Sequence, residues 1–260
     1  MDWLGVGTAV RERSVATGAA GVRTATGRWL LHTSLDQLTG RYGVPAYTLH
    51  RSDLHQMLHT AAGRADLRTG HRVTAVTNTA DGVQVHYRNA HGVGSASADL
   101  VIAADGVHSP VRHQLFPDHP GPTYAGYVTW RGVVPADTAP GNLPGLTETW
   151  GRGQRFGIAP LADGRVYWFA TTIAAEGVHV DDDLPAVADR FAGWHEPIPQ
   201  LLAATPRRRC SATTSTTWPA PYPPTSPDGS CCSATPPTPS PPTSAKGPPR
   251  PSKTPSPSPA

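Results

Sequence analysis

The stretch "ADLVIAADGVHSPVRHQLF", residues 98–116, decides the fold assignment because it holds three local signals in one short segment. Residues 100–103 are all apolar, which is typical of a short strand buried on both faces of an α/β sheet. Asp105 and Gly106 form a turn signal, and Ser109 can cap a helix that follows it. The same order of strand, turn and helix also occurs without a ligand, so the pattern alone leaves a bare structural turn equally open.

The segments around this stretch predict an α/β part followed by an α+β part. "TLHRSDLHQMLHTAAG", residues 48–63, places apolar residues at helical spacing behind Ser52, a candidate N-cap. Residues 71–89 alternate apolar and polar on both sides of Asp81-Gly82, which predicts a hairpin. Residues 124–172 hold several β-rich runs divided by turn signals, and residues 184–194 and 198–204 predict two closing helices. This order indicates an α+β sheet grafted on an α/β one.

Composition divides the chain into a part that can fold and a tail. The chain has 29 prolines, of which 17 lie in residues 206–260, and its last large aliphatic residue is Leu202. A segment without large apolar side chains cannot offset the entropy lost on ordering. We therefore expect a folded region over residues 1–205 and a disordered tail over residues 206–260.

Charge and cysteine content exclude several classes of function. The net charge is +3, but the only dense basic cluster is residues 207–209, which indicates a solvated linker and no nucleic-acid partner. No apolar run is long enough for a membrane span or a secretory signal, so we expect a cytoplasmic protein. All three cysteines lie in the tail. His55 and His59 sit four apart without a third ligand nearby, so we expect no metal site.

Asp105, Gly106, Ser109 and Arg112 match an Asp-Gly-x-x-Ser-x-x-Arg motif. With this motif the chain resembles the FAD-dependent aromatic hydroxylases, single-component flavoprotein monooxygenases with a p-hydroxybenzoate-hydroxylase-like fold. Residues 50–58 are similar to that family's Arg-x-x-Leu-x-x-x-Leu helix. Residues 124–134 and 153–170 resemble the substrate sheet of the branch with urate, salicylate and 3-hydroxybenzoate hydroxylases.

The resemblance implies particular site residues and cofactors. It assigns FAD contacts to Arg51, Val73, Asp105 and Gly106, and substrate-side catalytic roles to Arg155 and Tyr167. Thr129 stands where the urate enzymes use an Asn to hold urate, so we do not expect urate as the substrate. For Tyr127, Trp130, Arg131 and Trp168 we expect packing roles within the sheet. The implied reaction uses FAD, NAD(P)H and O₂ to hydroxylate an aromatic or heteroaromatic small molecule.

The resemblance also implies a domain arrangement. Residues 1–122 would form an incomplete Rossmann-like FAD-binding domain that lacks the family's opening strand, Gly-x-Gly-x-x-Gly turn and helix. Residues 123–205 would form an inserted mixed β-sheet substrate domain, and residues 206–260 the tail. We therefore expect an impaired fragment of such a monooxygenase.

The residues of the tail permit the family's missing motif if its codons are read one base out of frame. With only wobble bases free, residues 231–238 permit "LLGDAAHA" and residues 242–253 permit "NLGQGAAQALED", which resemble the Gly-Asp and glycine-rich helix motifs beside the flavin. A frame shift between residues 205 and 210 accounts for this. The alternatives are a non-catalytic binding module with a genuine Pro-rich tail, or a flavin epoxidase or reductase of the same fold.

Overall fold

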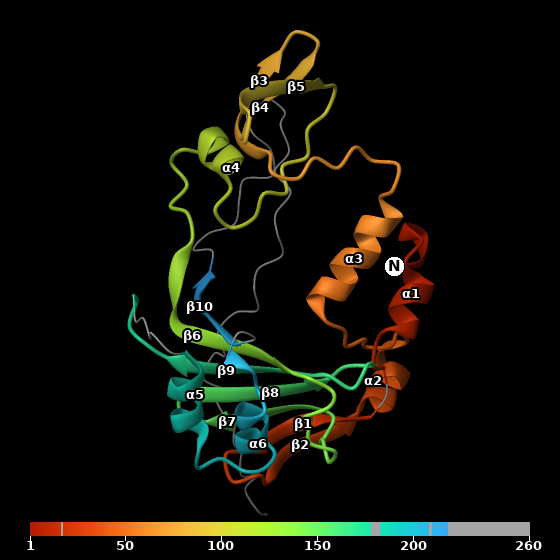
Figure 1. Ribbon diagram of the computed structural model, residues 1–260, viewed down its shortest axis with the longest axis vertical. Helices are drawn as coiled ribbons and strands as arrows, with labels where there is room; N and C mark the ends of the chain where they lie inside the picture. Colours follow the sequence, from red (N-terminus) through yellow and green to blue (C-terminus); the bar gives the residue numbers. More distant parts are fainter. Residues whose placement is uncertain (17, 178–182, 208–209, 218–260) are drawn as a thin grey trace, which may run out of the picture.

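A seven-stranded mixed sheet forms the larger part of the protein in this computed structural model (Figure 1). The structure describes residues 1–16, 18–177, 183–207 and 210–217. The strand order is β10-β6-β9-β8-β7-β1-β2. The pairs are antiparallel except β1 with β7. The strands are β1 (Ala19–Thr24), β2 (Trp29–Ser34), β6 (Thr123–Val134), β7 (Leu146–Gly151), β8 (Gln154–Pro160), β9 (Val166–Ile173) and β10 (Cys210–Thr217).

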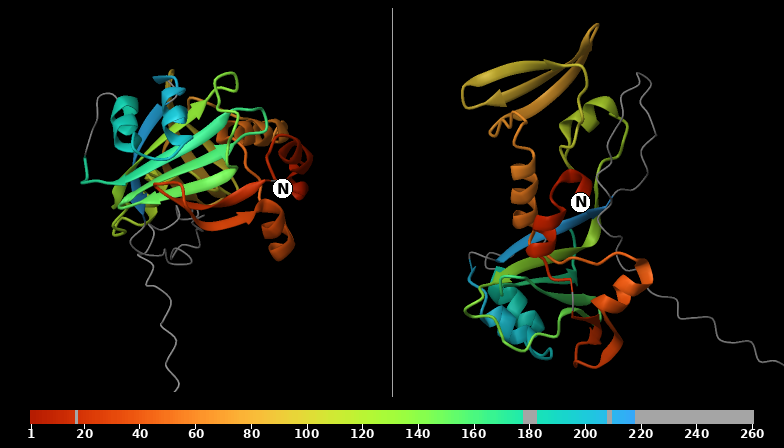
Figure 2. Two further views of the ribbon diagram at one scale, coloured as in Figure 1. Left: turned by 90° about the horizontal axis from the view of Figure 1, so that it is seen from below. Right: turned by 90° about the vertical axis from the view of Figure 1, so that its right-hand side faces the viewer.

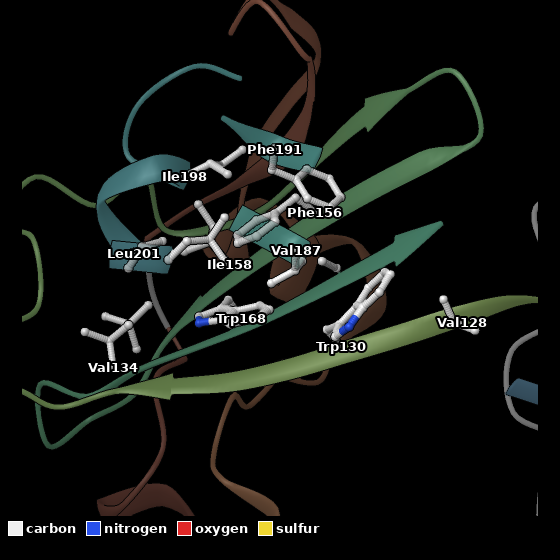
Figure 3. Packing of buried hydrophobic residues seen from close by; sticks show 13 residues of the cluster. Val128, Trp130, Val134, Phe156, Ile158, Trp168, Val187, Phe191, Ile198 and Leu201 are labelled. Carbon is white, nitrogen blue, oxygen red and sulfur yellow. The ribbon is translucent and has the colours of Figure 1, made fainter. Parts of the chain in front are cut away.

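Two helices, α5 (Asp183–Phe191) and α6 (Ile198–Ala203), cover one face of this sheet and confirm the two predicted closing helices. Strand residues alternate between the two faces, so Trp130, Phe156 and Trp168 point from the sheet into the core, as Figure 3 shows. The Phe156 and Trp168 rings stack with centroids 5.4 Å apart. Phe191 of α5 meets Phe156 edge-on at 5.5 Å. The expected packing roles of Trp130 and Trp168 are therefore confirmed.

One close contact in this core requires glycine. A Cβ at Gly132 would lie 2.4 Å from the Trp168 ring, so the ring occupies the space that a side chain would need. The indole nitrogen of Trp168 donates to Thr205 Oγ1 at 2.9 Å, and that hydroxyl donates to Leu201 O at 2.7 Å. The buried indole is thus satisfied by the helix end that covers it, which fixes α6 on the sheet.

A smaller antiparallel sheet consists of β3 (Arg72–Thr79), β4 (Gly82–Asn89) and β5 (Gly92–Ala98). The predicted hairpin around Asp81 is confirmed, because Thr79 pairs with Gly82. Helix α4 (Pro110–Leu115) docks on β3 through Gln114. The Gln114 Oε1 accepts from Val76 N at 2.9 Å and Nε2 donates to Val76 O at 2.5 Å. The side-chain amide thus makes the two hydrogen bonds that a paired strand residue would make with Val76.

Four helices lie in the described part of the first 61 residues; the one that follows β2 lies beside the large sheet, and the others lie between the two sheets (Figures 1 and 2). They are the short η1 (Asp2–Leu4), α1 (Gly7–Glu12), α2 (Leu35–Tyr42) and α3 (Arg51–Ala61). The helix predicted from residues 48–63 is confirmed as α3, although its N-cap is His50 and not Ser52. Met57 of α3 packs with Val6 and Val10, which joins the middle of α3 to α1. Within the described residues no helix is long and apolar enough to cross a membrane.

The predicted buried strand at residues 100–103 is wrong. The structure assigns no strand there, and Leu100 and Ile102 are 75% and 73% exposed. Within the described part of the chain, neither sheet includes this segment, so its backbone has no ladder partner and its side chains have no covering layer. A run of apolar residues indicates that a segment tends to be buried. Whether it is buried depends on a strand or helix that covers it, and the local sequence does not specify that element.

Two strand pairings cross the expected domain boundaries. β1 and β2 come from residues assigned to the cofactor-binding part, yet they extend the large sheet beside β7. β10 pairs with β6 from Cys210↔Gly132 to Thr217↔Thr123, so the ordered sheet continues into the range expected to be a disordered tail. Its threonines are β-branched residues that suit a strand. Residues 218–260, including both remaining cysteines, lie outside the described residues.

Replacing Phe191 by alanine should destabilise the fold by about 3–5 kcal/mol, because the ring is fully buried between Phe156 and Trp194. Denaturant titration measures this change in the free energy of unfolding. Leu31→Ala, at a side chain 59% exposed on edge strand β2, is the control and should change it by no more than about 0.5 kcal/mol. Equal effects for the two variants would contradict the position of the core.

Candidate functional site

A cavity of about 660 Å³ lies between the N-terminal end of α3 and the sheet face opposite the core. One wall comes from the chain entering α3 and from its first turns, and the other comes from β6, β8, β9 and β10. The lining residues are Thr48, Leu49, His50, Arg51, Ser52, His55, Arg131, Gly132, Val133, Ala159, Leu161, Tyr167 and Ser211.

Strand register explains why the sheet wall has this composition. Tyr167 pairs with Val133 on one side and with Ala159 on the other, and paired residues of antiparallel strands share a face. Arg131 lies two residues before Val133 on the same face and pairs with Ser211 of β10. The adjacent Trp130 and Trp168 belong to the core face, so alternation delivers polar groups to the cavity from strands that are otherwise apolar.

Tyr167 is the one phenol in the cavity wall. Burial raises the pKa of Tyr167, and the hydrogen bond and charge of Arg131 offset this only in part. The hydroxyl therefore stays protonated at neutral pH and can both donate and accept a hydrogen bond. A neutral phenol at this place can contact a ring substituent of a bound small molecule.

The charged groups of the lining are of one sign. Arg51 on α3 and Arg131 on β6 bring guanidinium groups from opposite walls, and none of the lining residues is a carboxylate. His50 and His55 add imidazoles, and His50 Nδ1 lies 2.6 Å from Ser52 Oγ. The remaining wall combines apolar side chains with the hydroxyl groups of Thr48, Tyr167 and Ser211. Such a cavity favours a largely apolar ligand that carries an anionic or strongly accepting group.

The Asp105-Gly106 turn is held in a defined shape beside α4. Ser109 Oγ donates to Asp105 Oδ1 at 2.6 Å and accepts from Arg112 N at 2.9 Å, which confirms the predicted cap. The Arg112 guanidinium donates to the carbonyls of Gly106, at 3.1 Å, and of Val107. Gly106 has φ of +84°, where side chains are strained, and no atom lies within 4 Å of the position of a Cβ. The backbone is thus open to close approach.

The six residues predicted for the site fall into three places. Arg51 and Tyr167 meet in the cavity. Asp105 and Gly106 lie in the turn before α4, and half-buried Val73 lies on β3, the strand on which α4 docks. Arg155 does not line the cavity.

Arg155 instead belongs to a cluster further along the same face of the sheet. Its guanidinium lies 2.5 Å from Glu148 Oε2 and 5.0 Å from the centre of the Trp150 ring. The Trp150 indole donates to the same carboxylate oxygen at 2.7 Å. The register Trp150↔Arg155 brings these residues together across β7 and β8.

Sequence reasoning missed the role of Arg131, Ser211 and the two histidines in the cavity wall. Arg131 was expected to have only a packing role, yet the alternation of β6 separates it from the buried Trp130. This alternation was a usable signal. Ser211 was not recoverable in this way, because its strand pairs with a segment about eighty residues away.

The donor set fits part of a dinucleotide cofactor. The Arg51 guanidinium and the Ser52 hydroxyl can bind phosphate and ribityl oxygens at the cavity. The open face of Gly106 admits a ligand to the backbone, and the Asp105 carboxylate can accept further hydrogen bonds from sugar hydroxyls.

Comparison with known proteins places the chain in a family. The model of the FAD binding domain family matches residues 1–174. The chain is 37% identical over 205 residues to an aurachin C monooxygenase/isomerase of Stigmatella aurantiaca, covering 78% of this chain and 52% of that protein. It is 34% identical over 205 residues to a 3-amino-4-hydroxybenzoate 2-monooxygenase of Streptomyces cremeus, covering 75% and 47%.

A solved structure is also similar to this chain in fold and in sequence. The crystal structure of Klebsiella pneumoniae HpxO complexed with FAD and uric acid has a TM-score of 0.77 and 30% identity, and the match covers 89% of this chain and 59% of that one. The matched relatives are monooxygenases, and the matched structure holds FAD. The chain belongs to the FAD binding domain family, whose cofactor is FAD and whose members typically use NAD(P)H. It spans about half the length of the curated relatives it matches.

Tyr167 should ionise at higher pH than an ordinary tyrosine, because burial disfavours the phenolate. The difference in ultraviolet absorbance titration between the protein and Tyr167→Phe isolates this group. Arg131→Gln should raise the midpoint further, since the Arg131 charge favours the phenolate. A Tyr167 midpoint that falls when Arg131 is removed would rule out the described contact.

Proposed function

We propose that this protein is an FAD-dependent monooxygenase that hydroxylates an aromatic or heteroaromatic ring bearing an anionic group. The observation that carries the proposal is the cavity whose lining includes both Arg51 and Tyr167, which were predicted separately for cofactor and substrate. When bound and reduced by NAD(P)H, the flavin would supply the oxygen chemistry, using O₂ to add one oxygen atom to the ring and releasing the other as water.

The residues of this chain would bind, orient and shield the reactants. Arg51 would hold a phosphate or ribityl oxygen of FAD, and Asp105 and Gly106 would contact the cofactor from the turn before α4. Arg131 would bind the anionic group of the substrate. Tyr167, protonated at neutral pH, would donate a hydrogen bond to a ring substituent. The apolar side chains of the wall would exclude water.

Two predicted residues keep roles that rest on family resemblance. Val73 would contact the adenine part of FAD through its backbone. Arg155 would act on the substrate side, where its ion pair with Glu148 lies on the same sheet face as Tyr167. An aromatic acid is supported as the substrate by the cationic lining and by the relative that acts on an aminohydroxybenzoate.

Arg131→Gln should weaken binding of a benzoate-type acid by about 10- to 100-fold, because a charge-assisted hydrogen bond is lost. Calorimetric titration with the acid and with the uncharged benzamide measures this. Arg190→Gln, which removes the same charge from a helix on the opposite sheet face, is the matched control and should leave affinity unchanged. Equal losses in the two variants, or an equal loss for benzamide, would contradict an anion contact at Arg131.

We also propose that the tail as written weakens FAD binding, so that this chain is impaired. The support is the out-of-frame Gly-Asp and glycine-rich motifs in residues 231–253, which lie outside the described residues. The protein with its present tail should lose FAD during gel filtration. A chain translated in the shifted frame from residue 210 should retain more. Near-stoichiometric flavin absorbance in the purified protein with its present tail would refute the impairment without touching the family assignment.

An epoxidase or a reductase of the same fold would use the same cavity and cofactor. Analysis of products from the shifted-frame protein with NAD(P)H and O₂ separates them from a hydroxylase. A stable core that binds a ligand and shows no flavin chemistry would instead favour a binding module.

A further inference from the structure

A three-residue ion network joins helix α3 to the sheet beside the cavity. The Arg165 guanidinium lies 2.8 Å from Asp53 Oδ2 of α3 through one terminal nitrogen, and 2.6 Å from Asp163 Oδ2 through Nε. The side chains of Arg165 and Asp53 are 25% and 31% exposed, whereas that of Asp163 is 53% exposed. The Arg165–Asp53 contact is therefore partly shielded from water and salt, unlike an ordinary surface pair.

The sheet side of this network is arranged by its own turn. Asp163 Oδ1 accepts from Arg165 N at 3.1 Å, and Leu161 N donates to Arg165 O at 2.9 Å. Gly164 has φ of +83°, which closes the tight turn between β8 and β9. Burial alone would lower the pKa of Arg165, but its hydrogen bonds and charge interactions with Asp163 and Asp53 raise it. The guanidinium is charged, and Asp163 holds it beside Asp53.

The helix side of the network carries the cavity residues. Asp53 lies in the first turn of α3, between Ser52 and the rest of the helix, and two residues after Arg51. Apolar packing holds α3 on α1 through Met57, with Leu54 of the first turn and Leu49 against the same cluster. These contacts fix α3 on α1 and not on the sheet. Within the described residues, the Arg165–Asp53 pair is a polar link from the N-terminal turn of α3 to the turn between β8 and β9.

Both walls of the cavity are thus connected to β9 and the turn directly before it. Arg165 lies in the turn directly before β9, two residues before Tyr167, so the residue that anchors α3 and the residue that lines the cavity are close neighbours in the chain. We propose that Arg165 and Asp53 are positioning residues that hold the N-terminal turn of α3, and with it Arg51, at a set distance from Tyr167. The consequence for ligand binding rests on the proposed function, whereas the consequence for helix position does not.

Hydrogen exchange tests the helix position without any ligand. The amides of Asp53 and Leu54 donate to His50 O at 3.1 and 3.2 Å, so they report the first turn of α3. Arg165→Gln and Asp53→Asn should each speed their exchange about tenfold or more, with the amides of β8 and β9 unchanged. Arg68→Gln is the matched control, since it breaks an exposed Arg–Asp pair in which the side chains are 55% and 70% exposed. It should have no effect at α3.

Charge reversal separates a specific pairing from a general loss of packing. The double variant D53R/R165D restores the pair with the charges exchanged and should return the exchange rates to near the wild-type values, whereas each single reversal should speed them. Equal exchange in the wild-type protein, R165Q and D53N, or additive effects in the double variant, would overturn the proposal.

Affinity for FAD then links position to function. In Arg165→Gln and Asp53→Asn the dissociation constant, measured by flavin fluorescence, should rise about tenfold with little change in thermal midpoint, and the double reversal should restore it. Faster exchange at α3 in a protein that binds no FAD in any variant would support the positioning role and contradict the proposed function. Binding that is unchanged in the single variants despite faster exchange would contradict the coupling of helix position to the cofactor.

Discussion

The alternation of side chains along β6 and β9 is the constraint on which the rest of the structure depends. Because successive strand residues face opposite ways, Trp130 and Trp168 pack into the core while Arg131 and Tyr167 face the cavity. The same two strands therefore supply stability on one side and chemistry on the other. A shift of one residue in either register would bury the charges and expose the indoles, so core packing itself enforces the composition of the cavity wall.

The second wall depends on long-range contacts of two kinds. Apolar packing of Met57 on α1 holds the body of α3, and the Arg165–Asp53 ion pair ties its first turn to the turn between β8 and β9. The cavity therefore needs contributions from residues about 110 positions apart in the sequence. The turn at Asp105 and Gly106 is held differently, by local hydrogen bonds to Ser109 and Arg112.

This difference explains what could be predicted from the sequence. The α3 helix, the hairpin at Gly82 and the Ser109 cap follow from periodicity, turn residues and capping, and all three are confirmed. The pairing of β1 with β7 and of β10 with β6 joins distant segments, and local patterns do not specify such partners. The apolar run at residues 100–103 fails as a predicted strand for the same reason, since the described chain gives it no neighbour.

The residues of the candidate site also divide into those that sequence patterns predict and those whose place depends on distant contacts. Family resemblance pointed to Arg51 and Tyr167, and the structure brings them into one cavity. It assigned Arg155 by position in the motif, but the side chain is held by Glu148 and Trp150 across the neighbouring strand. Arg131 follows from alternation once the core face of β6 is known. The measurement that tests the account most directly is a crystal structure of this chain soaked with FAD. We predict flavin density between the first turn of α3 and the Arg131–Tyr167 face. Density elsewhere on the chain, with this cavity empty, would contradict the account.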